Sequence, residues 1–294
     1  MTDKAHPTET GLRGLLKAAV RRALRPAVWD LQQSVARLES AVGEFRAAQQ
    51  RQARHGAVWR GGADGSAYSP GGDVDHAATL KYRDELEYWI AAVAGSDPAH
   101  GPRFVEVFST WQTTRLNELA DRLALDRGAP MDQWCAGRDV VEIGGGPIPC
   151  CAFRRFRSAV AIDPLADGYM ACNLMPAAAL GRGIVHLSAC GESIPLCSAS
   201  ADLVIAENCL DHTDEPALVV NQIFRILRPG GYLWLLVDLM DYRDHMHPSP
   251  MSPQRLDSLL TPLGMVTLYN ESWEGASHPM ARLQLRMLVQ KPPA

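Results

Sequence analysis

The strongest constraint on the fold is a change of pattern after Arg138. From there the chain alternates short apolar runs, rich in β-branched residues, with stretches of helical character. The runs are VVEI (140–143), AVAI (159–162), IVHL (184–187), DLVIA (202–206) and YLWLLV (232–237). Strands that alternate with helices are joined by right-handed crossovers. This order therefore predicts a parallel sheet with helices on its faces.

Two further apolar runs close the chain, MVTLY (265–269) and RLQLRMLVQ (282–290). They follow a predicted helix over 253–263 and have only a loop between them. Parallel neighbours need a long crossover, so this pair is expected to be antiparallel. The predicted fold class is α/β: a parallel sheet with a terminal antiparallel strand pair, preceded by N-terminal helices.

The first 52 residues carry two helical patterns. In 11–25, apolar residues alternate with five basic ones, which is typical of a solvated helix or of one that lies on an acidic membrane surface or partner. From Leu24 to Phe45, apolar residues recur at steps of four and three, which is a heptad seam. We expect a short coiled coil that makes a homo-oligomer through 24–45, or a helix that packs on the rest of the chain.

The remainder divides into three predicted segments. Residues 53–76 are rich in Gly, Ser and Pro, which predicts a flexible linker. Residues 77–130 hold two amphipathic stretches, over 80–94 and 104–125, that predict a helical cap. Residues 131–294 contain the alternating pattern and form the main predicted domain.

Charge and composition exclude some classes of protein. Residues 1–60 carry 11 Lys and Arg against 5 Asp and Glu, so the formal charge of −4 leaves −10 for the rest. An acidic body is a poor nucleic-acid binder. Seven cysteines without a C-x-x-C pair predict neither a disulfide framework nor a zinc site. With no membrane-length apolar run and no export signal, we expect a cytoplasmic protein.

The sharpest motif is VVEIGGGPIP, in which a predicted strand ending near Glu142 runs into Gly144, Gly145 and Gly146. Glycines allow a tight turn and a close approach of backbone to ligand, and a nearby acid suits a cationic amine. A purely structural turn and a dinucleotide site are the alternatives. A dinucleotide fingerprint starting at Gly144 would end on glycine where this chain has Pro149, which argues against that site.

Further polar residues follow the next predicted strands. Asp163 ends the second one, 21 residues after Glu142, where a carboxylate can accept hydrogen bonds from ribose hydroxyls or cap a helix. CGESIPL (190–196) follows the third, Asn208 follows the fourth, and RPGG (228–231) precedes the fifth.

These segments, in this order and spacing over roughly 135–290, resemble the class I S-adenosylmethionine (SAM) dependent methyltransferases, in particular the broad group that acts on small molecules. The resemblance implies a Rossmann-like sheet, the class I methyltransferase fold, with SAM as cofactor. It also implies cofactor-binding residues: Glu142, Gly144, Gly145 and Gly146 at the methionine part, Asp163 at the ribose, Cys190, Gly191 and Glu192 at the adenine, and Asn208 beside the methyl group.

The sequence departs from the family pattern at two places. Cys190 stands where an aspartate often binds the adenine amino group, so backbone amides would have to replace that contact. Ile148 stands where the family frequently has a third glycine, so the first helix is expected to begin differently.

Three histidines are candidates for the general base that a hydroxyl acceptor requires. His212 follows the fourth predicted strand, and His245 and His247 follow the fifth in VDLMDYRDHMHP. The acids and histidines of these segments are also possible ligands for Mg²⁺ or another divalent ion. A polar lid loop with surface histidines is the alternative interpretation.

The preferred hypothesis is methylation of a hydroxyl on a sugar or another small polar natural product, with a small molecule or glycan as acceptor. A second hypothesis is a non-catalytic scaffold with a relict SAM fold, assembled through the N-terminal coiled coil. A third is an oxidoreductase with a nucleotide cofactor. Heat on adding SAM separates the first from the second, and an absorbance change with NADH or NADPH would reveal the third.

Overall fold

The computed structural model describes residues 76–97, 101–176, 183–274, 280–281 and 283–293. The predicted basic helix over 11–25, the coiled coil over 24–45 and the linker up to residue 75 lie outside the described residues. The prediction of self-association and that of a peripheral membrane contact therefore concern a part of the chain of which the structure says nothing.

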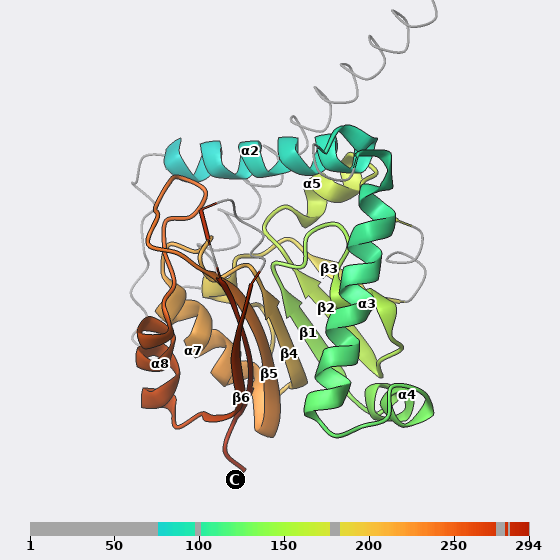
Figure 1. The fold of residues 1–294 in the computed structure, drawn as a ribbon, viewed down its shortest axis with the longest axis vertical. Helices are drawn as coiled ribbons and strands as arrows, with labels where there is room; N and C mark the ends of the chain where they lie inside the picture. The colour runs from blue at the N-terminus through green and yellow to red at the C-terminus, as the bar shows by residue number, and fades with distance from the viewer. Residues whose placement is uncertain (1–75, 98–100, 177–182, 275–279, 282, 294) are drawn as a thin grey trace, which may run out of the picture.

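A seven-stranded sheet forms the centre of the molecule (Figure 1), with the order β3-β2-β1-β4-β5-β7-β6. Strands β1 to β5 pair in parallel, while β7 is antiparallel to both β5 and β6. The predicted fold class is confirmed, including the terminal antiparallel pair. The strands are β1 (Asp139–Ile143), β2 (Ser158–Ile162), β3 (Val185–Leu187), β4 (Ala201–Glu207), β5 (Leu227–Leu239), β6 (Val266–Glu274) and β7 (Leu283–Gln290).

Helices cover both faces of this sheet, with α3 and α4 on one side and α7 and α8 on the other (Figure 1). The α-helices are α2 (His76–Ala91), α3 (Phe104–Arg122), α4 (Ala129–Ala136), α5 (Ala166–Ala171), α7 (Pro216–Ile226) and α8 (Pro253–Leu260). Short helical turns are η1 (Ala92–Ser96), η2 (Gly101–Arg103), η3 (Cys150–Phe153), η4 (Gly191–Ser193) and η5 (Thr261–Leu263). None of the described helices is long and apolar enough to cross a membrane.

Strand β4 shows why a parallel strand buried on both faces reads as a continuous apolar run. Leu203 and Ile205 point into the core beneath α3, and Val204 and Ala206 point into the core beneath α7. All four side chains are fully buried. Alternate side chains of a strand face opposite sides of the sheet, so an uninterrupted apolar run is what two covered faces require.

The connection after β1 departs from the helix that usually follows a first strand in such folds. Residues 144–149 form an irregular loop, and only the four-residue turn η3 follows it. Pro147 and Pro149 lack the N–H that a helix interior needs. Helix α3 contacts this loop, since the Gln112 side chain donates to the carbonyl oxygen of Ile148 at 3.0 Å. The expectation raised by Ile148, that the first helix begins differently, is confirmed.

The two helices expected to form a cap occupy different places. Helix α3 is one of the layers of the domain, because Leu116 and Leu119 pack with Ile205 of the sheet. Helix α2 instead crosses above the carboxyl ends of the strands (Figure 1) and packs through Leu86 onto Leu165. Of these two, α2 is therefore the helix that can close over a site at the strand ends.

Candidate functional site

A pocket that is partly open to solvent, which we call the cavity, lies where β1, β2 and β4 end beneath α2. In open α/β sheets this edge, where neighbouring connections diverge, is the usual position of a ligand. Six of the residues predicted to bind a cofactor line the cavity: Gly144, Asp163, Cys190, Gly191, Glu192 and Asn208.

Gly144 provides bare backbone at the cavity wall. Its φ of 67° lies in the left-handed region, and a Cβ there would come within 2.4 Å of the Cβ of Cys209. Both the conformation and the contact exclude a side chain. The glycine predicted from the sequence to allow close ligand approach therefore stands at the cavity.

Gly145 and Gly146 are not among the residues that line the cavity. A Cβ on Gly145 would lie 2.8 Å from an oxygen of Glu142, and one on Gly146 would lie 2.8 Å from the Trp89 ring of α2. The φ of Gly146 is 61°, again left-handed. This half of the glycine turn is occupied by the protein's own packing, with Trp89 covering Gly146.

Glu142 holds the same loop from below. Its two carboxylate oxygens accept hydrogen bonds from the backbone N–H groups of Cys150 and Cys151, both at 2.7 Å. Burial raises the pKa of Glu142 to about 7, although these N–H groups oppose the rise. The structure does not bring Glu142 to the cavity, in contrast to the expectation that it contacts the ligand. Its carboxylate instead fixes the turn that shapes the cavity.

Asp163 faces the cavity and is fixed by two backbone groups. One oxygen accepts from Gly146 N–H at 3.1 Å, and the other accepts from Leu165 N–H at 2.8 Å. The second contact lies just before α5, whose N-cap residue is Leu165 and which has no side-chain cap, so Asp163 fixes the turn into the helix and is not its cap. Burial raises the pKa of Asp163. A carboxylate held in this way is positioned to accept further hydrogen bonds from a ligand.

Two more strand ends complete the wall. Asn208 follows β4 with a φ of 45°, a conformation that asparagine tolerates better than most residues. Gly191 packs closely on α7, since a Cβ there would lie 3.1 Å from Val219. The side chain of Cys190 lies 3.6 Å from the Tyr82 hydroxyl. This places the predicted adenine loop opposite α2.

Helix α2 supplies cavity residues that sequence reasoning missed: Lys81, Tyr82 and Glu85. Burial raises the pKa of Glu85, the neighbouring Asp163 raises it further, and Lys81 opposes the shift. The signal in the sequence was two charged residues four positions apart on the side of the helix that also carries Trp89. Helical periodicity shows which residues share a face, but not what that face covers.

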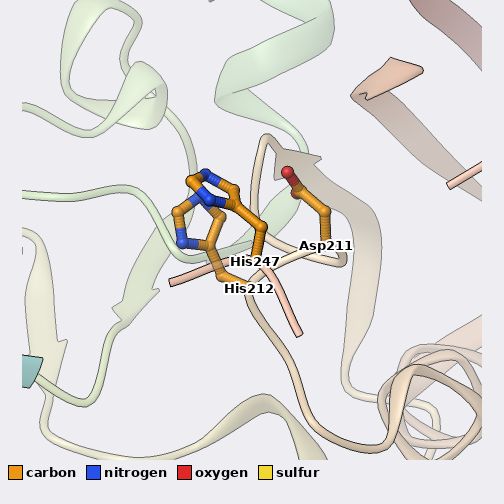
Figure 2. Close-up of side chains that lie close together, drawn as sticks. All are labelled: Asp211, His212 and His247. Atoms are coloured by element: carbon orange, nitrogen blue, oxygen red, sulfur yellow. The ribbon is translucent and has the colours of Figure 1, made fainter. Parts of the chain in front are cut away.

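Figure 2 shows a second group of side chains, of which His212 lines the cavity. Asp211 and His212 come from the loop after β4, and His247 comes from the segment after β5. The two imidazole rings are 4.4 Å apart between centroids, and one potential ligand atom from each of the three residues lies within 4.8 Å of the others. Burial raises the pKa of Asp211 to about 7. We call these three residues the histidine cluster.

The structure separates the three candidate bases. His212 lines the cavity, and the ring of His247, which is not among the lining residues, packs against the ring of His212. His245 does not line the cavity: its ring is 50% exposed, and Nε2 lies 2.9 Å from a carboxylate oxygen of Asp84 on α2. Neighbouring positions in an irregular loop point in different directions, which sequence spacing does not reveal.

Comparison with known proteins agrees with this fold. Residues 141–235 match the family described as a methyltransferase domain. A protein from Mycobacterium sp. (strain KMS), described as an uncharacterized methyltransferase, is 35% identical over 97 residues, which are 32% of this chain and 36% of that protein. Another from Mycobacterium bovis (strain BCG / Pasteur 1173P2) is 27% identical over 128 residues, or 38% of this chain and 47% of that protein. The matches thus span less than half of these relatives.

Solved structures share the fold at low identity. The 1,6-didemethyltoxoflavin-N1-methyltransferase of Burkholderia thailandensis, solved with S-adenosylhomocysteine, has a TM-score of 0.51 and 15% identity, over 76% of this chain and 93% of that one. The [4+2]-cyclase SpnF has a TM-score of 0.50 and 13% identity, over 74% and 95%. These likenesses concern the fold alone, since one of the two proteins is named for a different reaction.

The half-buried carboxylate of Glu85, with its raised pKa, predicts a specific pH dependence of stability. Its pKa in the folded protein lies above its usual value of 4.5, so folding takes up a proton. The stabilisation that this proton uptake gives the folded state is complete below about pH 4.5. As the pH rises through the folded-state pKa, the free energy of unfolding falls by up to about 1.4 kcal/mol per pH unit. Glu85→Gln should therefore flatten the fall in the free energy of unfolding between pH 5 and 8, measured by urea denaturation.

Glu87→Gln is the matched control for this measurement. Glu87 lies on the same helix, exposed, 3.8 Å from Arg83. The Glu87→Gln variant should show nearly the same dependence of the free energy of unfolding on pH as the unmodified protein. An unaltered profile in Glu85→Gln would contradict the burial of an ionisable group at this position.

Proposed function

We propose that this chain is a SAM-dependent methyltransferase that binds SAM in the cavity beneath α2 and methylates a hydroxyl of a small polar molecule such as a sugar. The observation that carries the proposal is the shared cavity wall: bare backbone at Gly144, the fixed carboxylate of Asp163 and the imidazole of His212 all line one space.

The residues present fit the cofactor. A SAM molecule carries a cationic sulfonium and a cationic amine, and the cavity wall holds the carboxyl groups of Glu85, Asp163 and Glu192. Burial makes a negative charge on Glu85 and on Asp163 costly, as their raised pKa values show. A cation in the cavity would relieve this cost. Asp163 would hold the ribose, and the loop at Cys190 and Gly191 would lie along the adenine.

SAM supplies a methyl group on its sulfonium sulfur, and the carbon–sulfur bond breaks with its electron pair on sulfur as an acceptor atom bonds to the carbon. The contribution of the protein is to orient both partners and to exclude water. Helix α2 serves the second purpose, because Tyr82 and Trp89 close the space between it and the strand ends.

A hydroxyl acceptor must also lose its proton. The histidine cluster is placed to promote that loss, since His212 belongs to the cavity wall and His247 supports it. A polar acceptor also suits a wall on which charged and amide side chains, such as Asn208 and Asp214, stand beside the imidazole. This is the argument for oxygen as the atom that is methylated.

Cofactor binding is tested by titrating the protein with SAM in a calorimeter. Asp163→Asn should weaken binding about tenfold or more, because it removes a charged hydrogen-bond acceptor. Asp167→Asn, four residues further along, in α5, and not among the residues that line the cavity, is the control and should bind normally. Melting temperatures of both variants separate lost contacts from lost folding. Absence of heat with the unmodified protein would favour the scaffold hypothesis instead.

Methyl transfer is tested by following S-adenosylhomocysteine formation with a panel of sugars and other hydroxylated small molecules. His212→Asn should lower kcat about 10²–10⁴-fold while the affinity for SAM changes little. His245→Asn should retain the rate, because His245 lies outside the cavity. Equal rates in His212→Asn and the unmodified protein would show that the group acting on the proton lies elsewhere.

A further inference from the structure

We propose that Asp211, His212 and His247 bind one divalent transition-metal ion at the edge of the cofactor cavity. The inference deepens the proposed function and rests on it for the catalytic role of the ion, because His212 also lines the cavity. The binding site itself rests on the geometry of three side chains from two separate segments.

The distances permit a shared ion. Potential ligand atoms of the three residues all lie within 4.8 Å of one another. Ligands about 2.1 Å from one tetrahedral ion are about 3.4 Å apart, so closing the site requires shifts of about 1 Å that side-chain rotation provides. Figure 2 shows the two imidazole rings lying against each other with the Asp211 carboxylate beside them.

An independent observation is the state of the Asp211 carboxyl group. Asp211 is only 1% exposed, and its Oδ1 atom has no hydrogen-bond partner among the described residues. Leaving a buried carboxylate oxygen unsatisfied is costly. A cation bound at Oδ1 supplies the missing interaction. A backbone hydrogen bond from Ser249 N–H to the carbonyl oxygen of Asp211 also joins the loop after β4 to the segment after β5, the two segments that provide the ligands.

A supporting carboxylate orients His247. Asp244 Oδ1 accepts hydrogen bonds from the backbone N–H groups of Met246 and His247, and His247 Nδ1 lies 3.0 Å from the same oxygen. Because Asp244 is the acceptor, Nδ1 is the protonated nitrogen and the lone pair of the neutral ring lies on Nε2. Histidines that bind metals commonly donate their other nitrogen to a carboxylate in this way.

The positive charge of Lys81 acts on the Asp211 carboxylate and opposes the rise in its pKa, but Lys81 makes its hydrogen bond elsewhere. Its ammonium group donates to the backbone carbonyl of His212, and no hydrogen bond between it and the Asp211 carboxylate is present in the described structure. This contact holds the loop after β4 against α2. It therefore positions His212 without satisfying Oδ1 of Asp211.

The donor set selects the class of ion. Two imidazoles and one carboxylate suit Zn²⁺, Fe²⁺, Co²⁺ or Ni²⁺, whereas Mg²⁺ and Ca²⁺ favour all-oxygen sites. Three protein ligands leave a coordination position open. An acceptor hydroxyl bound there would have a lowered pKa, and its O–H bond would break with release of the proton to water before the oxygen attacks the methyl carbon.

The test is titration of chelator-treated protein with Co²⁺, followed by visible absorption, and with Zn²⁺, followed by calorimetry. The unmodified protein should bind one ion of either metal per chain, with ligand-field absorption for Co²⁺. His212→Ala and His247→Ala should each weaken binding at least about 100-fold, and Asp244→Asn about 10–100-fold. His245→Ala is the matched control, a histidine two positions from His247, and should bind as the unmodified protein does.

Circular dichroism and melting curves establish that each variant is folded. The metal site would be overturned if the unmodified protein did not bind one ion per chain, or if folded His212→Ala and His247→Ala bound the ion as tightly as the unmodified protein. SAM titration of the same metal-free sample keeps the two proposals apart. SAM binding without metal binding overturns the metal site alone, and metal binding without SAM binding overturns the proposed function alone.

Discussion

The site depends on two buried carboxylates that hold one loop. Glu142, near the end of β1, accepts hydrogen bonds from the N–H groups of Cys150 and Cys151, and Asp163, after β2, accepts one from Gly146. Hydrogen bonds to a charged acceptor are stronger than neutral ones, and buried donors left unpaired are costly. The loop after β1 is therefore fixed at both ends, although only the short turn η3 follows it. Gly144 is held at the cavity as a result.

The same carboxylates give the site its electrostatic character. Asp163 and Asp211 are buried, Glu85 is half-buried beside them, and burial raises the pKa of each. A cation that enters the site stabilises the charged forms of these carboxyl groups. Both proposed ligands, a sulfonium nucleoside and a divalent ion, carry such a positive charge, so these carboxylates would favour the binding of either one. Lys81 offsets part of this cost from α2.

Much of this arrangement could be predicted from the sequence, because parallel strands buried on both faces leave a clear apolar pattern. The parallel sheet, the terminal antiparallel pair, Gly144 and Asp163 follow from that pattern and from the family resemblance. The role of Glu142 could not be predicted, since a carboxylate at a strand end can face a ligand or the backbone beneath it. The path of α2 could not be predicted either, because helical periodicity shows which residues share a face of the helix but not which part of the protein that face covers. The sequence also could not show that His212 lines the cavity and His245 does not, because this depends on the paths of two irregular loops.

The central claim is that SAM lies between the glycine loop and α2. Its most direct test is amide hydrogen–deuterium exchange of the full chain with and without SAM. The account predicts slower exchange in both the loop that begins at Gly144 and the segment over 81–85, because both line the cavity in which the ligand would lie. Unchanged exchange in these two segments at saturating SAM, or protection confined to another part of the chain, would contradict it.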